Sequence, residues 1–122
     1  MVAMVALLAA RMAPAHHAFS MYDNQQDVSL NGTVREFLWI NPHCRIRLLV
    51  TDAGGKGLEW NLTGRSPNAL LGEGWTRYSL RTGDKATIVI HPAKDGTRAG
   101  SIVSISVNGA LVGHGFDAPT TP

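Results

Sequence analysis

Apolar and polar residues alternate along much of this 122-residue chain. Alternation with a period of two is typical of β-strands that bury one face. In the second segment of this kind, Cys44, Ile46 and Leu48 share one face, and in the last, Val103 and Ile105 share one face. We expect both of these faces to point into the core. The pattern predicts five strands, over residues 27–39, 44–51, 58–63, 86–91 and 101–107.

The spacing of the strands and one glycine predict the fold. Gly32 interrupts the first strand, where glycine marks a bulge or a sharp bend. A short helix is expected after the third strand, because Ser66 suits an N-cap, Pro67 suits the first helical position and Gly72 suits the end. Three strands, one helix between strands 3 and 4, and two more strands predict a mainly β, five-stranded, OB-like Greek-key barrel. An open sandwich or a barrel of another topology is the alternative.

Both ends of the chain differ from its middle. An apolar run of ten residues opens it, which is too short to span a bilayer, and Ala13-Pro14-Ala15 follows as an A-x-A cleavage site. We therefore expect a signal peptide over 1–15, truncated at its start, a barrel domain over 16–108 and a loosely ordered tail over 109–122. This predicts a periplasmic or secreted protein without stable membrane insertion after processing. A short core helix of a cytoplasmic protein is the alternative for the apolar run.

The net charge, the single cysteine and the absence of known catalytic motifs exclude several classes of function. The formal net charge of +2 is too small to indicate nucleic acid or an anionic membrane as a partner. The single cysteine, Cys44, excludes an intramolecular disulfide, and its inward position indicates a small buried hydrophobe, with a thiolate ligand as the alternative. The sequence contains no nucleophile elbow, phosphate loop or His-Glu-x-x-His motif, so we expect that the protein is not an enzyme.

Several short motifs follow one another in a distinctive order. They are His16-His17-Ala18-Phe19, residues 30–37, Asn41-Pro42-His43, Ser66-Pro67-Asn68, and His91-Pro92 followed by Asp95-Gly96. Together they resemble the DUF6152 family of small, exported bacterial proteins of uncharacterised function. The resemblance covers His16 to about Val107 and implies a signal-bearing, single-domain β protein. Two features depart from it: Cys44 stands where an apolar or aromatic residue is expected, and the amino-terminal signal looks truncated.

The histidines of these motifs are candidate metal ligands. Cleavage after Ala15 would start the chain at His16, with its α-amine beside the imidazoles of His16 and His17, which suits a borderline-soft ion such as Cu(II) or Ni(II). Pro42 breaks the strand ladder, so His43 begins the second strand, while His91 ends the fourth. These two strand ends can share one rim of a barrel. We therefore predict a copper or zinc site built from these four histidines, with structural roles for them as the alternative.

The outer face of the second and third strands is a second candidate site. OB-like barrels bind ligands on this face, and here it carries Arg45, Arg47, Glu59 and Asn61. These side chains suit a polar or anionic small ligand or an envelope protein partner, and a merely solvated face is the alternative. We expect no nucleic acid, because Trp60 alternates inward and leaves the face without a stacking platform.

Overall fold

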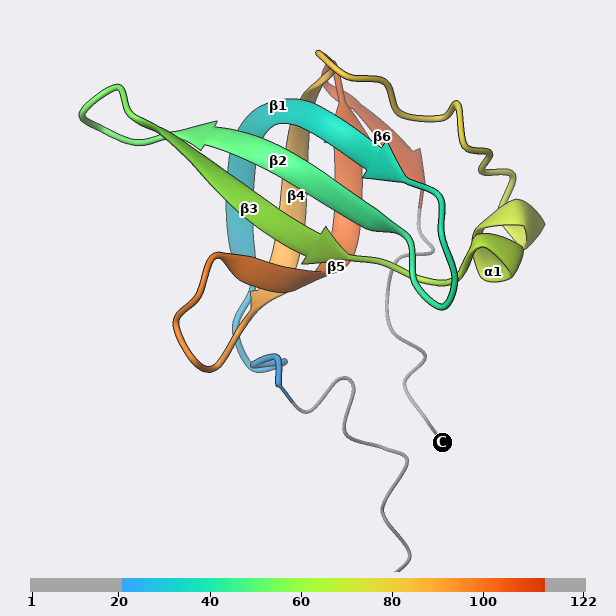
Figure 1. Cartoon of the computed structure of the whole chain (residues 1–122), viewed down its shortest axis with the longest axis horizontal. Helices are drawn as coiled ribbons and strands as arrows, with labels where there is room; N and C mark the ends of the chain where they lie inside the picture. The colour runs from blue at the N-terminus through green and yellow to red at the C-terminus, as the bar shows by residue number, and fades with distance from the viewer. Residues whose placement is uncertain (1–20, 114–122) are drawn as a thin grey trace, which may run out of the picture.

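The computed structural model describes residues 21–113, which form six strands and one short helix (Figure 1). The elements are β1 (Val28–Leu38), β2 (Arg45–Thr51), β3 (Gly57–Thr63), α1 (Pro67–Gly72), β4 (Lys85–Pro92), β5 (Ala99–Val107) and β6 (Ala110–Gly113).

Five of the strands close into a barrel. The sheet has the order β3-β2-β1-β4-β5-β6, with antiparallel neighbours throughout. A parallel pairing of Asn61–Thr63 in β3 with Ala99–Ser101 in β5 joins the two sides. The predicted mainly β, five-stranded barrel with one short helix between its third and fourth strands is confirmed.

β1 serves both sides of the barrel because it bends sharply, as the arch in Figure 1 shows. Its first half pairs with β4 and its second half with β2, and Thr33 pairs with both. Gly32 lies at the bend, where a Cβ atom would come 2.5 Å from the carbonyl oxygen of Leu49. Only glycine allows the two backbones to approach so closely. The bulge itself lies three residues later, at Arg35, between the paired residues Val34 and Glu36.

The barrel interior is filled by the inward faces that the alternation predicts for β2 and β4. Ile46 and Leu48 from β2 meet Ile88 and Ile90 from β4, each at most 1% exposed. Cys44 is 1% exposed, so the prediction of a buried cysteine is confirmed. Burial raises the pKa of its thiol, and a hydrogen bond with the Ile40 backbone lowers that pKa by less. The thiol form is therefore favoured over the metal-binding thiolate.

The prediction that Val103 faces the core is wrong. Ile90 pairs with Ile102 and Val89 pairs with Ser104, so Val103 is an extra residue in a bulge of β5. A bulge changes the phase of the alternation by one residue. As a result, Ile102 and Ile105 are buried, while Val103 is only half-buried.

α1 begins and ends where its sequence predicts. The Ser66 hydroxyl accepts a hydrogen bond from the Ala69 N–H at 3.2 Å, and Pro67 occupies the first turn. The helix buries Leu70 fully, and its end leads into Trp75, which is 3% exposed and contacts the ring of Phe37 edge-on. α1 therefore covers the end of the barrel beside the β1–β2 loop (Figure 1).

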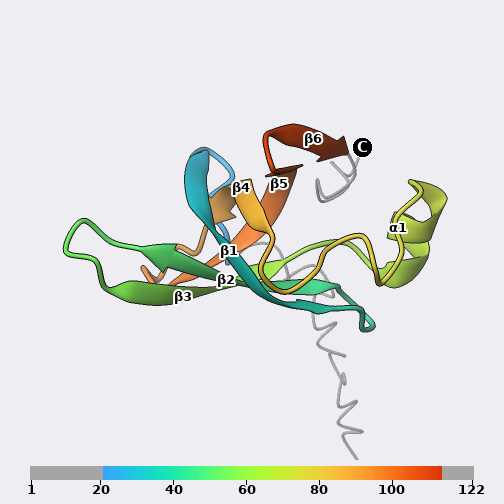
Figure 2. The same cartoon turned by 90° about the horizontal axis from the view of Figure 1, so that it is seen from above.

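β6 is an addition to the predicted fold. It pairs with β5 and lies on the side of the molecule away from β2 and β3 (Figure 2). Its four residues belong to the segment that the sequence assigned to a loosely ordered tail, and an Asn108-Gly109 turn with positive φ at both residues starts it. The predicted signal peptide over 1–15, the first residues of the predicted domain over 16–20 and the rest of the tail over 114–122 lie outside the described part. Within residues 21–113, no helix has the length and apolar character needed to cross a bilayer.

Candidate functional site

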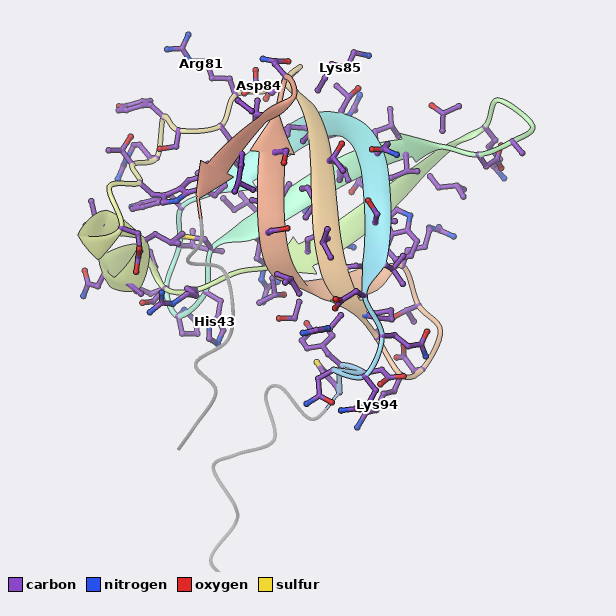
Figure 3. The ribbon with its side chains drawn as sticks, turned by 180° about the vertical axis from the view of Figure 1, so that it is seen from behind. His43, Arg81, Asp84, Lys85 and Lys94 are labelled. Carbon is purple, nitrogen blue, oxygen red and sulfur yellow. The ribbon has the colours of Figure 1, made fainter. Side chains whose placement is uncertain are left out.

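The two described histidines lie at different strand ends. β2 and β4 both run antiparallel to β1, so the start of β2, which His43 precedes by two residues, and the end of β4, which carries His91, are opposite ends of strands that run in the same direction. The pairings of His91 with Ser101, Ser101 with Thr63 and Thr63 with Arg45 put three inter-strand steps between them. We call the end of β4 that carries His91 the histidine rim. Figure 3 shows His43 on the side of α1, apart from Lys94.

The described amino-terminal segment docks at this same rim. Tyr22 forms an isolated β-bridge with Ala93, and the Lys94 N–H donates to the carbonyl of Met21 at 2.9 Å. The hydroxyl of Tyr22 donates to the Thr63 hydroxyl oxygen at 3.3 Å. These contacts hold Met21 and Tyr22 against the barrel, beside the β4–β5 loop (Figure 1).

His91 is held by groups on the chain just before β1. Its Nδ1 lies 3.0 Å from the carbonyl oxygen of Gln26 and 3.2 Å from the Asp27 carboxylate. Because a carbonyl only accepts, Nδ1 carries the hydrogen, and the neutral ring then presents Nε2 as an acceptor. Carboxylates and carbonyls orient metal-binding histidines in this way. The side chain of His91 is 28% exposed, so the rim leaves part of it open to solvent.

The described residues alone do not complete a metal site. Between residues 21 and 113, no group of three or more His, Cys, Asp or Glu side chains could hold a metal ion. His91 and the start of β2 are separated by three inter-strand steps of about 4.8 Å each around the barrel wall. His16 and His17 lie outside the described residues. The rim thus offers His91 as a donor near Met21 and Tyr22, whereas His43 is too far from His91 to share an ion with it.

The predicted ligand face on β2 and β3 is exposed, but much of its charge is compensated. Arg47 lies opposite Asn61 and is flanked by two carboxylates, Glu36 at 3.4 Å and Glu59 at 3.9 Å. Arg45 is exposed and forms no ion pair with any residue from 21 to 113. Glu36, which belongs to β1 and not to the predicted face, reduces the attraction of this face for an anion. The face therefore has less support as a binding site than the rim.

The β4–β5 loop beside this face has a rigid turn of its own. The Asp95 carboxylate accepts hydrogen bonds from the backbone N–H of Thr97 at 2.9 Å and from its hydroxyl at 2.7 Å. These bonds hold the pKa of Asp95 below its usual value. The loop also reaches β3, where Arg98 Nε donates to the carbonyl of Glu59 at 3.2 Å. Asp95 is thus committed to the loop and is not a spare ligand for the rim.

Comparison with known proteins establishes the family. Residues 4–103 match the model of a family of unknown function (DUF6152). The chain belongs to this family. The resemblance seen in the sequence motifs is therefore confirmed, and it carries no activity with it. No curated protein and no solved structure matches this DUF6152 chain.

Two residues that support the rim of this DUF6152 protein were missed in the sequence. Gln26 and Asp27 lie 65 and 64 positions before His91, and no local motif connects them to it. They meet His91 only because β1 pairs with β4. An acidic residue directly before a strand is a common surface feature, so its presence alone carries no signal.

Proposed function

We propose that this DUF6152 protein is an exported, non-enzymatic binding protein of the bacterial cell envelope that holds a copper or zinc ion at the histidine rim. Its ligands would be His91 through Nε2, the amine and imidazole of His16 at the processed amino terminus, and His17, while His43 would keep a structural role. The observation that carries this proposal is the geometry of His91. Its Nδ1 is engaged by Gln26 and Asp27, which supports Nε2 as a ligand.

The length of the chain before Met21 supports the proposed ligand set. His17 precedes Met21 by four residues and His16 by five, so an extended chain reaches at most about 14 and 18 Å, respectively. The carbonyl of Met21 is bonded to Lys94, three residues after His91. Both amino-terminal histidines are therefore within reach of His91 on chain length alone.

The chemistry of these donors favours copper or zinc. Neutral imidazole and amine nitrogens suit Cu(II), Ni(II) and Zn(II), and Cu(II) binds most tightly in the usual order of divalent metals. Hard cations such as Mg²⁺ prefer oxygen ligands. The α-amine becomes available only when the apolar leader is removed, so the proposed site would form after export.

Calorimetric titration of the processed protein, starting at His16, is expected to show Cu(II) or Zn(II) binding with a dissociation constant below about 10 μM. His91→Ala should weaken binding, and one additional glycine before His16 should weaken it by displacing the amine. His114→Ala is the matched control, since His114 belongs to the predicted tail. Binding weaker than 10 μM for both metals, or equal losses in the His114 and His91 variants, would contradict the proposal.

Asp27→Asn is expected to weaken metal binding about tenfold or more, because partners that orient a ligating histidine contribute 10- to 100-fold to affinity. Asp52→Asn makes the same charge change in the β2–β3 hairpin and should leave the affinity unchanged. Thermal unfolding of both variants checks that the fold is intact. Equal metal affinity in the Asp27 variant and the parent protein would show that His91 is not oriented for a metal.

A further inference from the structure

A polar groove lies on the outer surface of the sheet, away from the histidine rim. It has a volume of about 410 Å³ and runs between β1, β2, β4 and the turn after β5. Figure 3 shows Lys85, which lines it, at the opposite end of the molecule from His43 and Lys94. Its polar side chains include Asn31, Thr33, Thr51, Lys85, Thr87 and Asn108.

Among residues 21–113, the groove is lined by one cationic side chain and no carboxylate. Lys85 is exposed, and it forms no ion pair with the residues that the structure describes. The neighbouring Asp84 carboxylate accepts the backbone N–H of Arg81 at 2.9 Å, which ties it to its own turn. Arg81 and Asp84 lie at this same end in Figure 3, outside the groove lining. The groove therefore favours a ligand that carries negative charge.

Hydrogen-bonding groups stand in a regular array on the floor of the groove. Asn31 lies opposite Thr87 and Thr33 lies opposite Lys85, so the two pairs are about 7 Å apart along the strands. The Thr87 hydroxyl donates to the Asn31 side-chain oxygen at 2.7 Å. This bond orients the Asn31 amide and leaves its NH₂ group as a donor and the Thr87 oxygen as an acceptor for a ligand.

We propose that this groove binds an acidic saccharide, whose hydroxyls bond to Asn31 and Thr87 and whose carboxylate pairs with Lys85. A volume near 400 Å³ is within the range of small-ligand sites. In an open groove, neutral hydrogen bonds add little over those to water, so the charge-assisted bond to Lys85 would decide the affinity. Nucleic acid is a poorer fit, because no aromatic side chain of residues 21–113 lines the groove for stacking.

NMR titration with trigalacturonic acid, using maltotriose as the uncharged comparison, tests this proposal. We expect trigalacturonic acid to bind with a dissociation constant on the order of 1 mM, to weaken as salt rises, and to shift the side-chain amide signals of Asn31. Maltotriose should bind at least about fivefold more weakly. Equal binding of the two sugars, or no binding of trigalacturonic acid at about 20 mM, would overturn the proposal.

Matched variants distinguish binding in the groove from non-specific attraction between charges. Lys85→Gln should weaken trigalacturonic acid binding about five- to tenfold, and Lys94→Gln, at the opposite end, should leave it unchanged. Thr87→Ala should weaken binding about threefold, and Thr87→Ser, which keeps the hydroxyl, should restore it. Equal losses in the Lys85 and Lys94 variants would show only non-specific charge attraction and would overturn the site. The groove shares no residue with the histidine rim, so His91→Ala should leave these results unchanged.

Discussion

Replacing Gly32 with alanine is expected to lower the free energy of unfolding by about 2–3 kcal/mol, as overpacking of a tight site does. An added Cβ would lie 2.5 Å from the backbone oxygen of Leu49 and 2.9 Å from Cγ of Leu48. The backbone contact can be relieved only by moving β1 away from β2, which weakens their pairing at Thr33. Thermal denaturation should show a fall in Tm of roughly 10–20 °C for a domain of this size.

Gly72→Ala is the matched control for this prediction. Nothing lies within 4 Å of an added Cβ at Gly72, and its φ is not in the left-handed region. Alanine there should be neutral or stabilising by less than about 1 kcal/mol, because it restricts the unfolded chain. A Gly32→Ala variant as stable as Gly72→Ala would show that β1 does not approach β2 as described.

Replacing Leu48 with alanine is expected to cost about 3–4 kcal/mol, near the middle of the range for buried leucines. Leu48 is fully buried in β2, between Val34 of β1 and Trp60 of β3. The closed barrel wall on both sides limits how far neighbouring strands can move to fill the space. Urea denaturation would measure the loss as a lower midpoint at an unchanged slope.

Leu71→Ala makes the same chemical change on the surface of α1, where the leucine is 54% exposed. It should change stability by less than about 0.5 kcal/mol. The double variant Gly32→Ala with Leu48→Ala adds a further test. It removes the contact with Leu48 Cγ but keeps the contact with the Leu49 oxygen, so it should remain less stable than Leu48→Ala alone. A double variant as stable as Leu48→Ala would show that the strain at Gly32 is in side chains only.

Much of the fold could be predicted because its signals are local. Alternation along β2 and β4 identifies their buried faces, and Ser66 and Pro67 mark the start of α1. The register of β5 could not be predicted, because the bulge at Val103 depends on its pairing with Val89 and Ile90. β6 was missed for a similar reason. Four residues after a turn form a strand only when the edge of β5 is present to receive them.

The candidate sites, like the fold, were predictable where the signal is local and not where it depends on strand pairing. The sequence alone indicates His43 and His91 as candidate ligands, because Pro42 breaks a strand before the one and a strand ends at the other. The separation of His43 from His91, and the Asp27 carboxylate beside His91, depend on pairings between distant strands. The polar groove has no motif at all. Asn31 and Thr87 are 56 positions apart, and each is an ordinary outward residue of a strand.

The amino-acid sequence by itself determined the order of elements, the barrel class, the buried face of most strands and the family of this protein. Only the tertiary structure decided where each histidine lies, how Arg47 is neutralised and where a groove opens. The reason is physical. The patterns that indicate a buried face or a turn lie in residues one to four positions apart. A site depends instead on strand registers, and a single bulge moves every following side chain to the opposite face.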